Sequence, residues 1–410
     1  MTSDLINGSP SSGGIRNDEA STLIESVRDS MPSDGSFDRK RLKDLALKLS
    51  IALETPGETA QRIAYLPAQT AVVRIANRLN IFHILATSNG PKSGTELAKM
   101  VGAEHALLIR LLRYLVSVAT IGEVGVDSYV ATNVTRSLSV PKIAAGVDHV
   151  CDSIAPCILA LPNFLRKTKY QNPTDLAHCP FQDAFSTTDT MFEWYPKNPE
   201  NLESFNMWMT GQREGRANWL DFFPLEEQLV RGFKDGKSDV MLVDVGGGVG
   251  HEVQAIKEKY PAIPGRFVLQ DVPSTIKQAR LVPGMEAMEH DFLTPQPVKG
   301  SRVYYLRNIL HDWPDDKSEL ILSQIAAAMT PGYSMILINE LMIPDQGANA
   351  IATQLDICMM SVFAATERTD TQYAKLMDKA GLKVERTWSD TSDGAESIMK
   401  VVLKKESGPV

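Results

Sequence analysis

The sequence predicts an α/β protein with a seven-stranded, Rossmann-like domain in its C-terminal half and a mainly helical, winged-helix-like domain before it. Three observations lead to this prediction. From Asp239 onward, short apolar runs alternate with helical stretches, the pattern of a mostly parallel sheet with helices on both faces. A glycine cluster directly follows the first of these runs. In the N-terminal half, helical periodicities lead into one short alternating segment.

The N-terminal part combines an expected tail with a helical unit. Residues 1–37 are rich in Ser, Gly and Asp, which predicts disorder, and they show neither a signal nor a transit peptide pattern. Helical spacing of apolar residues and one alternating stretch then predict three helix-rich segments and a hairpin. These patterns lie at 38–53, 71–85, 94–118 and, for the hairpin, 122–131. Helices followed by a hairpin are the order of a winged-helix unit.

The C-terminal pattern predicts seven strands and five helices, with a hairpin at the C-terminal edge. The predicted strands are 240–245, 266–270, 285–289, 303–306, 335–339, 383–388 and 397–403. The predicted helices are 250–260, 273–279, 315–329, 353–363 and 371–380. We therefore expect a tail at 1–37, a mainly helical domain at 38–200, and an α/β domain at 201–405.

Composition argues against several classes of partner. The 410 residues carry a formal net charge of −8 without any basic block. The stretch 104–118 would be the recognition helix of a winged-helix unit, and it holds only Arg110 and Arg113 as cations. Nucleic-acid binding is therefore not expected. No apolar stretch approaches the roughly 18 residues that a membrane span needs, so no membrane association is expected either. Four cysteines without metal-ligand spacing are typical of reduced thiols in a cytoplasmic protein.

A glycine-rich loop follows the first strand of the predicted sheet. It reads Asp244-Val-Gly246-Gly247-Gly248-Val-Gly250 and opens a helix, so a ligand can approach the backbone where no Cβ intervenes. A nicotinamide-binding strand looks similar, and a tight turn without a ligand is the structural alternative. Two further acids, Asp271 and Asp291, close the next two strands.

The positions of these acids favour a cationic cofactor. A carboxylate two residues before the first glycine suits a sulfonium ligand with an ammonium group, whereas it would repel a pyrophosphate. Asp271 can accept the ribose hydroxyls, and Asp291 can meet an adenine amino group while Phe292 covers the ring. We therefore expect S-adenosylmethionine as cofactor, and no catalytic metal ion.

Four segments together resemble the caffeate-type O-methyltransferases of plants and fungi, class I enzymes that depend on S-adenosylmethionine and not on a cation. They are Asp244–Gly250, His290–Phe292, Arg307–Pro314 and Asn339–Asp345. The resemblance covers about residues 77–404 and is nearest to the fungal secondary-metabolite branch. It implies that 201–405 form a class I methyltransferase domain that binds S-adenosylmethionine. It also implies that the winged-helix-like domain at 38–200 forms a homodimer and helps to close the acceptor pocket, and that the acceptor is a small phenol or enol.

The resemblance also implies roles for individual residues. For the cofactor these are Asp244, Gly246, Gly247, Gly248, Asp271, Asp291, Phe292 and Arg307, the last through its backbone. His311 matches the general base, with Glu340 and Glu367 as flanking acids that orient it. Phe205, Met209, Asp312, Met360 and Ala364 match the acceptor side. Two departures stand out: arginine replaces the usual lysine at 307, and Ala365-Thr-Glu-Arg-Thr369 replaces a Gly-Lys-Glu-Arg segment.

The proposed chemistry is base-assisted methylation of a hydroxyl group. A phenol with a pKa of about 10 is mostly protonated at neutral pH, so a base such as His311 has to take its proton. Plainer interpretations exist for each residue. The His311-Asp312 segment could cap the following helix, the two glutamates could be solvated loop acids, and Met360 could belong to the core.

Two other functions remain open at the level of sequence. A pericyclase or dehydratase on the same fold would keep the cofactor but leave its methyl group in place. A non-catalytic scaffold would need neither the loop nor the histidine. Retention of His311, Gly246 and Asp271 favours the methyltransferase.

Overall fold

The structure, a computed structural model, describes residues 17–31, 38–211, 218–233, 237–389 and 397–404. The chain divides into two compact units between Cys151 and Asp152, whereas the sequence pattern placed a boundary after residue 200. The difference arises because the helices that follow Asp152 contact a helix of the C-terminal part, at 350–363. The acceptor-side residues Phe205 and Met209 therefore lie in the same unit as the sheet.

The first unit begins with a helix where the sequence pattern indicated disorder. Helix α1, Asn17–Asp29, packs against α2, Arg39–Leu53, so the prediction of a disordered tail was wrong for these residues. Polar composition hid a helical repeat in α1, in which Ala20, Ile24 and Val27 recur at spacings of three and four. Residues 1–16 and 32–37 of the expected tail lie outside the described residues.

The rest of the first unit is the expected winged-helix-like arrangement. Asn80, with a φ of 56°, divides the apolar stretch predicted as one segment at 71–85 into two helices. Ser93 caps the next helix through a capping box, and Gly102 ends that helix at a φ of 68°. The elements are α3 Pro56–Ala64, α4 Leu66–Arg78, α5 Ile81–Thr87, α6 Gly94–Val101, α7 His105–Ser117, β1 Gly122–Gly125, β2 Ser128–Val130, α8 Asn133–Leu138 and α9 Pro141–His149.

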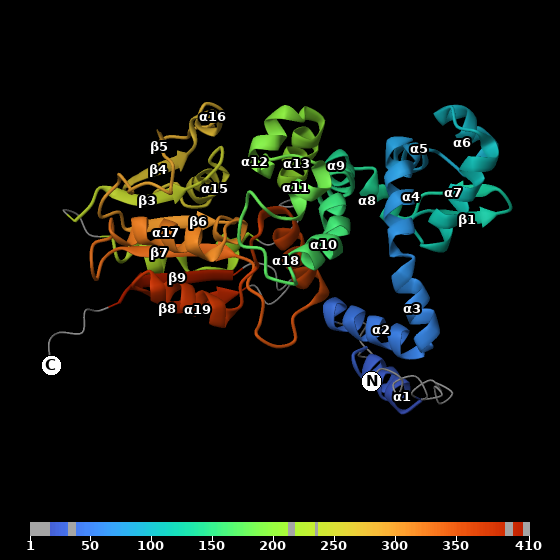
Figure 1. Ribbon diagram of the computed structural model, residues 1–410, viewed down its shortest axis with the longest axis horizontal. Coiled ribbons are helices and arrows are strands. Elements are labelled where there is room, and N and C mark those ends of the chain that lie inside the picture. The colour runs from blue at the N-terminus through green and yellow to red at the C-terminus, as the bar shows by residue number, and fades with distance from the viewer. Residues whose placement is uncertain (1–16, 32–37, 212–217, 234–236, 390–396, 405–410) are drawn as a thin grey trace. The chain divides into compact units, whose positions relative to one another are not determined.

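The second unit opens with short helices that the sequence pattern did not resolve. They are η1 Val150–Ile154, which spans the division, then α10 Ala155–Lys167, α11 Pro180–Phe185, α12 Met191–Trp194, η2 Tyr195–Lys197, α13 Pro199–Gly211, α14 Trp219–Phe222 and η3 Glu226–Val230. Helices α10 and α11 contact each other and α18, Ala350–Phe363, as Figure 1 also shows.

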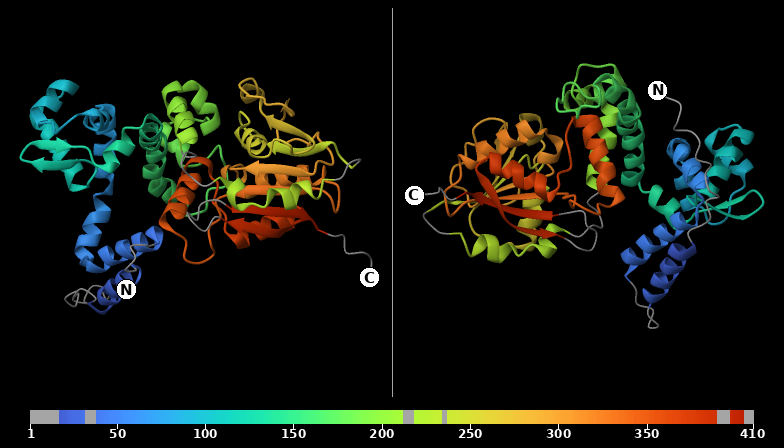
Figure 2. Two further views of the ribbon diagram at one scale, coloured as in Figure 1. Left: turned by 180° about the vertical axis from the view of Figure 1, so that it is seen from behind. Right: turned by 60° about the horizontal axis from the view of Figure 1, so that its bottom comes forward.

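A seven-stranded sheet forms the centre of the second unit, as predicted. Its order is β5-β4-β3-β6-β7-β9-β8, and β9 runs antiparallel to both of its neighbours, β7 and β8, whereas the other adjacent pairs are parallel. The strands are β3 Val240–Val245, β4 Arg266–Asp271, β5 Met285–Glu289, β6 Val303–Arg307, β7 Met335–Glu340, β8 Leu382–Ser389 and β9 Ser397–Leu403. In Figures 1 and 2, β4 and β5 (gold) lie at one edge and β8 and β9 (red) at the other. The expected hairpin is present at the C-terminal edge.

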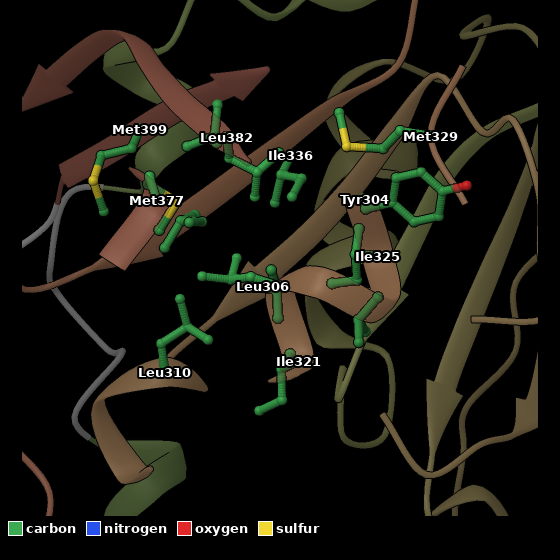
Figure 3. Close-up of a cluster of buried hydrophobic side chains, with 14 of the residues drawn as sticks. Tyr304, Leu306, Leu310, Ile321, Ile325, Met329, Ile336, Met377, Leu382 and Met399 are labelled. Carbon is green, nitrogen blue, oxygen red and sulfur yellow. The ribbon is translucent and has the colours of Figure 1, made fainter. Parts of the chain in front are cut away.

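Alternating strand residues bury both faces of this sheet. Tyr304 and Leu306 of β6 pack with α17, Asp315–Ala326, and α19, Asp370–Lys379, in the cluster of Figure 3. Tyr305 faces the other way and joins a second cluster. That cluster includes side chains of α14 and of α15, His251–Lys259. Two filled faces hold the carboxyl ends of β3, β4, β6 and β7 in fixed register, so the residues that follow these strands meet at one edge.

One helical run among the described residues is long and apolar enough to cross a membrane. It covers Pro141–Lys167, with a mean hydropathy of 1.4 over its most apolar window, so the expectation that no such stretch exists was wrong. A core helix meets the same criterion, and α10 supplies Cys157 and Phe164 to the interior of the second unit. The run is therefore weak evidence for a membrane span. The four cysteines are free thiols.

Candidate active site

The glycine loop after β3 is held against the neighbouring strand. The amides of Gly246 and Gly247 both donate to the carbonyl of Gln270, at 2.8 and 3.1 Å. A Cβ on Gly247 would lie 2.3 Å from the carboxylate of Asp244, and Gly248 has a φ of 63°. The loop therefore favours glycine at two successive positions. At Gly247 a side chain would clash with Asp244, and at Gly248 the positive φ disfavours any residue with a Cβ.

Two of the predicted acids flank this loop. Asp244 is buried near the end of β3, with 1% of its surface exposed. Asp271 ends β4, where its Oδ2 accepts from the amide of Gly248 at 2.9 Å and its Oδ1 from the amide of Val272 at 2.8 Å. These bonds orient the Asp271 carboxylate, and each oxygen keeps a second lone pair that can accept a hydroxyl.

Aromatic side chains follow the acid at the end of β5. Asp291 is exposed and Phe292 is half-buried, directly after that strand. The Phe292 ring lies perpendicular to that of Trp313, with centroids 5.7 Å apart. Trp313 in turn stacks on Phe192 of α12 at 6.1 Å and 16°. An aromatic series thus runs from Phe292 toward the helices at the start of this unit.

Arg307, the last residue of β6, directs its side chain to α15. Its Nη1 pairs with Oε1 of Glu252, and the other oxygen of that carboxylate accepts from Nε1 of Trp219 at 2.9 Å. Both charged side chains are largely buried. This pair holds the end of β6 beside the helix that the glycine loop opens. A backbone contact from Arg307 to the cofactor stays a prediction.

The residue set around the loop fits a cationic adenosine cofactor. Asp244 and Asp271 offer carboxylates to an ammonium group and a ribose diol, and Phe292 offers an aromatic face for adenine. At Gly247 the Asp244 carboxylate and Leu269 occupy the space of a Cβ, so the loop packs this close to the strand ends only with glycine there.

His311 lies in the short helical turn η4, Leu310–Asp312, directly after β6. Its Nδ1 is 2.8 Å from Oε1 of Glu367, and its Nε2 is 3.5 Å from Oδ1 of Asp312. Among the described residues, Oε2 of Glu367 is buried without a hydrogen-bond partner. The His311–Glu367 pairing expected from the resemblance is therefore present, and it fixes the imidazole through Nδ1.

The electrostatics of this cluster favour the charged imidazole. Burial by itself lowers the pKa of His311, but the charges of Asp312 and Glu367 and the hydrogen bond to Glu367 outweigh it and raise that pKa. Burial also raises the pKa of Asp312, against the opposing effect of His311. The upward shifts of the two pKa values oppose each other, because a protonated, uncharged Asp312 would stabilise the imidazolium of His311 less. The net shift of the His311 pKa is upward, because its bond to the buried Glu367 is short.

Glu340 occupies a different place from the one expected. It ends β7, is 1% exposed, and its Oε1 accepts from the amides of Ile309 and Leu310 at 3.0 and 2.6 Å. Its Oε2 accepts from the hydroxyl of Tyr373. Glu340 thus holds the backbone before His311 and makes no hydrogen bond to the imidazole. The interpretation of Glu340 as a solvated acid was wrong, because β7 buries it.

The predicted acceptor residues are only partly brought together. Phe205 of α13 stacks on Tyr195 at 5.0 Å and 25°, in the same apolar cluster as Ala364, which ends α18 at a φ of 51°. Met360 is half-buried on α18, and Met209 is half-buried on α13.

Sequence reasoning missed three residues that fix the turn of His311. They are Asp356, which accepts from the Glu367 amide at 2.9 Å, Arg368, and Tyr373. The adjacency of Arg368 to Glu367 was the one available signal.

Comparison with known proteins agrees with this geometry. The O-methyltransferase domain family matches residues 165–383, and the O-methyltransferase dimerisation domain family matches residues 66–140. The methyltransferase cfoC of Aspergillus candidus is 44% identical over 88% of this chain and 90% of its own length.

Two solved structures show the same fold over nearly the full chain. One is described as a pericyclic reaction enzyme and another as LepI in complex with S-adenosylmethionine. Each has a TM-score of 0.82 and 36% identity, and covers 94% of this chain and 98% of its own. The chain therefore belongs to the family of S-adenosylmethionine-dependent O-methyltransferases that join a dimerisation domain to a class I methyltransferase domain.

Proposed function

We propose that this protein methylates a hydroxyl group of a small secondary metabolite, a phenol or an enol, with His311 as general base. The bond from Glu367 to Nδ1 carries the proposal. A carboxylate at that atom holds the proton on Nδ1, which leaves the lone pair of Nε2 for the acceptor hydroxyl. Positioned bases of this kind contribute about 10²–10⁴-fold to rate.

The cofactor is S-adenosylmethionine, which supplies when bound a methyl group on positively charged sulfur. Asp271 would hold its ribose, Asp244 and the loop of Gly246–Gly248 its methionine portion, and Asp291 and Phe292 its adenine. The role of His311 is to remove the proton from the acceptor oxygen as that oxygen becomes the nucleophile. Glu367 stabilises the resulting imidazolium without taking its proton.

The raised pKa of His311 places a condition on this mechanism. A raised pKa favours the protonated imidazole in the free enzyme, and that proton has to leave before His311 can act as base. A positive charge brought beside it disfavours the imidazolium and lowers that pKa. Binding of a cationic cofactor would therefore favour the basic form of His311 in the complex that needs it.

The residues expected on the acceptor side support an apolar, planar acceptor. Phe205 and Ala364 belong to an apolar cluster, and Met360 is partly accessible on α18. Methionine and aromatic side chains accommodate flat rings of varied outline. Polyketide phenols satisfy this description.

We further propose that the protein acts as a cytoplasmic homodimer. The match of residues 66–140 to a dimerisation domain supports it. Large apolar side chains in that segment support it too, since Met100 and Leu107 are 56% and 48% exposed. A single species of twice the chain mass in light scattering is the expected result.

A second candidate is a pericyclase or dehydratase that keeps the methyl group on sulfur. The likeness to a pericyclic reaction enzyme at 36% identity favours it. Against it stands the intact His311–Glu367 pair, which suits removal of a proton from a hydroxyl.

Transfer of a labelled methyl group separates these functions. Protein is incubated with S-adenosylmethionine that carries a trideuterated methyl group and with a panel of phenols and enols. A product that carries the trideuterated methyl group supports the transferase. The His311→Asn variant should lose this labelled product while it still binds the cofactor. Converted acceptors without label would support the second candidate.

A further inference from the structure

The turn that bears His311 is held from its N-terminal side by hydrogen bonds to β7. The amide of Asn308, which has a φ of 51°, donates to the carbonyl of Asn339 at 3.1 Å. The next two amides donate to the carboxylate of Glu340. A negative charge therefore fixes the N–H groups that precede His311.

A buried arginine holds the same turn from its carbonyl side. Arg368 is 1% exposed, and its Nη1 donates to the carbonyl of Leu310 at 2.6 Å while its Nη2 donates to that of Trp313 at 2.8 Å. Its Nε and Nη2 also reach Oδ1 of Asp315, at 3.0 and 2.9 Å. The two carbonyls belong to the residues immediately before His311 and immediately after Asp312.

The planar guanidinium of Arg368 fixes the directions of these hydrogen bonds. Its N–H donors leave in a rigid fork, so bonds to two carbonyls and one carboxylate define its plane and the path of the turn. The flexible ammonium of a lysine cannot bond all three acceptors in that geometry. Burial of the charge is tolerated because the guanidinium bonds these acceptors.

Arg368 also follows Glu367 directly in the chain. Glu367 binds the imidazole of His311 through Nδ1, and Arg368 binds the backbone on both sides of that imidazole. One dipeptide therefore determines the orientation of the ring and the position of its backbone together. Asp356 anchors this dipeptide to α18 through the amide of Glu367.

We propose that Arg368 is a positioning residue, which aims Nε2 of His311 at the acceptor hydroxyl by fixing the turn at 310–313. The proposal rests on the proposed function of His311 as general base. Arg368 is buried and bonds two backbone carbonyls, Asp315 and Ser318, so it would act through the backbone and not by contact with acceptor or cofactor. Its loss should therefore impair proton removal more than cofactor binding.

The test is Arg368→Lys, with Arg266→Lys as matched control. Arg266 also forms forked bonds to carboxylates, those of Glu286 and Asp239, but lies exposed at the start of β4. A catalytic group that is misplaced by about 1 Å lowers the reaction rate about 100-fold. We therefore expect kcat to fall roughly 10- to 100-fold in Arg368→Lys. The affinity for S-adenosylhomocysteine should stay within about twofold of wild type, a shift below 0.5 kcal/mol. The control should match wild type in both.

A second readout does not depend on activity. In protein labelled with ¹⁵N-histidine, the ring nitrogens of His311 report its pKa and tautomer, and Arg368→Lys should shift both while the control shifts neither. Asp315→Asn provides a milder variant if Arg368→Lys does not fold, because Asp315 is exposed and bonds the guanidinium from outside. It should shift the His311 resonances in the same direction by less.

Several outcomes would overturn the proposal. One is a folded Arg368→Lys protein with wild-type kcat and unchanged His311 resonances. Another is an equal loss of cofactor affinity and kcat, which would mark a general structural role. If wild-type protein transfers no methyl group to any acceptor, the proposed function fails, and the His311 resonances still decide the role of Arg368.

Discussion

Nδ1 of His311 lies 2.8 Å from Oε1 of Glu367, and the glutamate side chain is completely buried. A carboxylate removed from water gains most from a cationic partner, so this pair favours a protonated imidazole. Once the second proton leaves, the lone pair of Nε2, which lies 3.5 Å from Oδ1 of Asp312, becomes the basic atom. One hydrogen bond between the turn after β6 and the loop after α18 thus joins the base, His311, to the acid that orients it, Glu367.

Replacement of Glu367 by glutamine should move the pH dependence of catalysis. The amide preserves the shape but removes the charge that raises the pKa of His311, so that pKa should fall. The base form then appears at lower pH, and the ascending limb of the pH profile of kcat/KM should shift to lower pH. Stopped assays from pH 5 to 10 measure it. Glu286→Gln, at an exposed ion pair, should leave the profile in place.

The charge of the cofactor should change the ionisation of His311. S-adenosylmethionine carries a sulfonium and S-adenosylhomocysteine does not, and a positive charge near an imidazolium lowers its pKa. Titration of ¹⁵N-histidine protein should therefore give a lower His311 pKa in the first complex than in the second. Equal values in the two complexes would show that the sulfonium does not lie near the imidazole.

Gly247→Ala should weaken cofactor binding. The added Cβ would lie 2.3 Å from the Asp244 carboxylate and 2.6 Å from Leu269, so the loop has to move away from the strand end. Calorimetry should detect at least about a tenfold loss of affinity, or 1.4 kcal/mol. Gly57→Ala adds a Cβ with no atom within 4 Å and should bind as wild type does.

Leu322→Ala should destabilise the second unit. Leu322 is fully buried between α17 and the sheet, and its truncation leaves a cavity that costs about 2–5 kcal/mol. Leu320 lies on the same helix with 36% of its surface exposed, so Leu320→Ala should cost far less. Urea denaturation of both variants, followed by tryptophan fluorescence, gives the comparison. Similar midpoints would argue against the assigned orientation of α17.

The sequence predicted the sheet well because buried strands between helices leave short apolar runs with clear ends. The runs at Val240–Val245 and Ser397–Leu403 match β3 and β9 residue for residue. Helix α1 was missed because Ser, Asp and Glu dominate its composition, whereas its packing on α2 is not visible in composition.

The site was predicted less completely than the fold. Residues at strand ends, such as Asp244 and Asp271, follow from the topology, and His311 with Glu367 followed from the resemblance. The role of Glu340 depends on where two backbone amides fall relative to β7, and that of Arg368 on where two carbonyls lie. Bonds from side chains to distant backbone leave no pattern in a sequence.

The stoichiometry between S-adenosylhomocysteine and product decides whether this enzyme transfers a methyl group. Mass spectrometry would quantify both after single turnovers with each converted acceptor, for wild type and for His311→Asn. We predict one S-adenosylhomocysteine per methylated product in the wild type, and loss of both together in the variant. Product formed without S-adenosylhomocysteine would contradict methyl transfer and establish the cofactor as a bound, unconsumed charge.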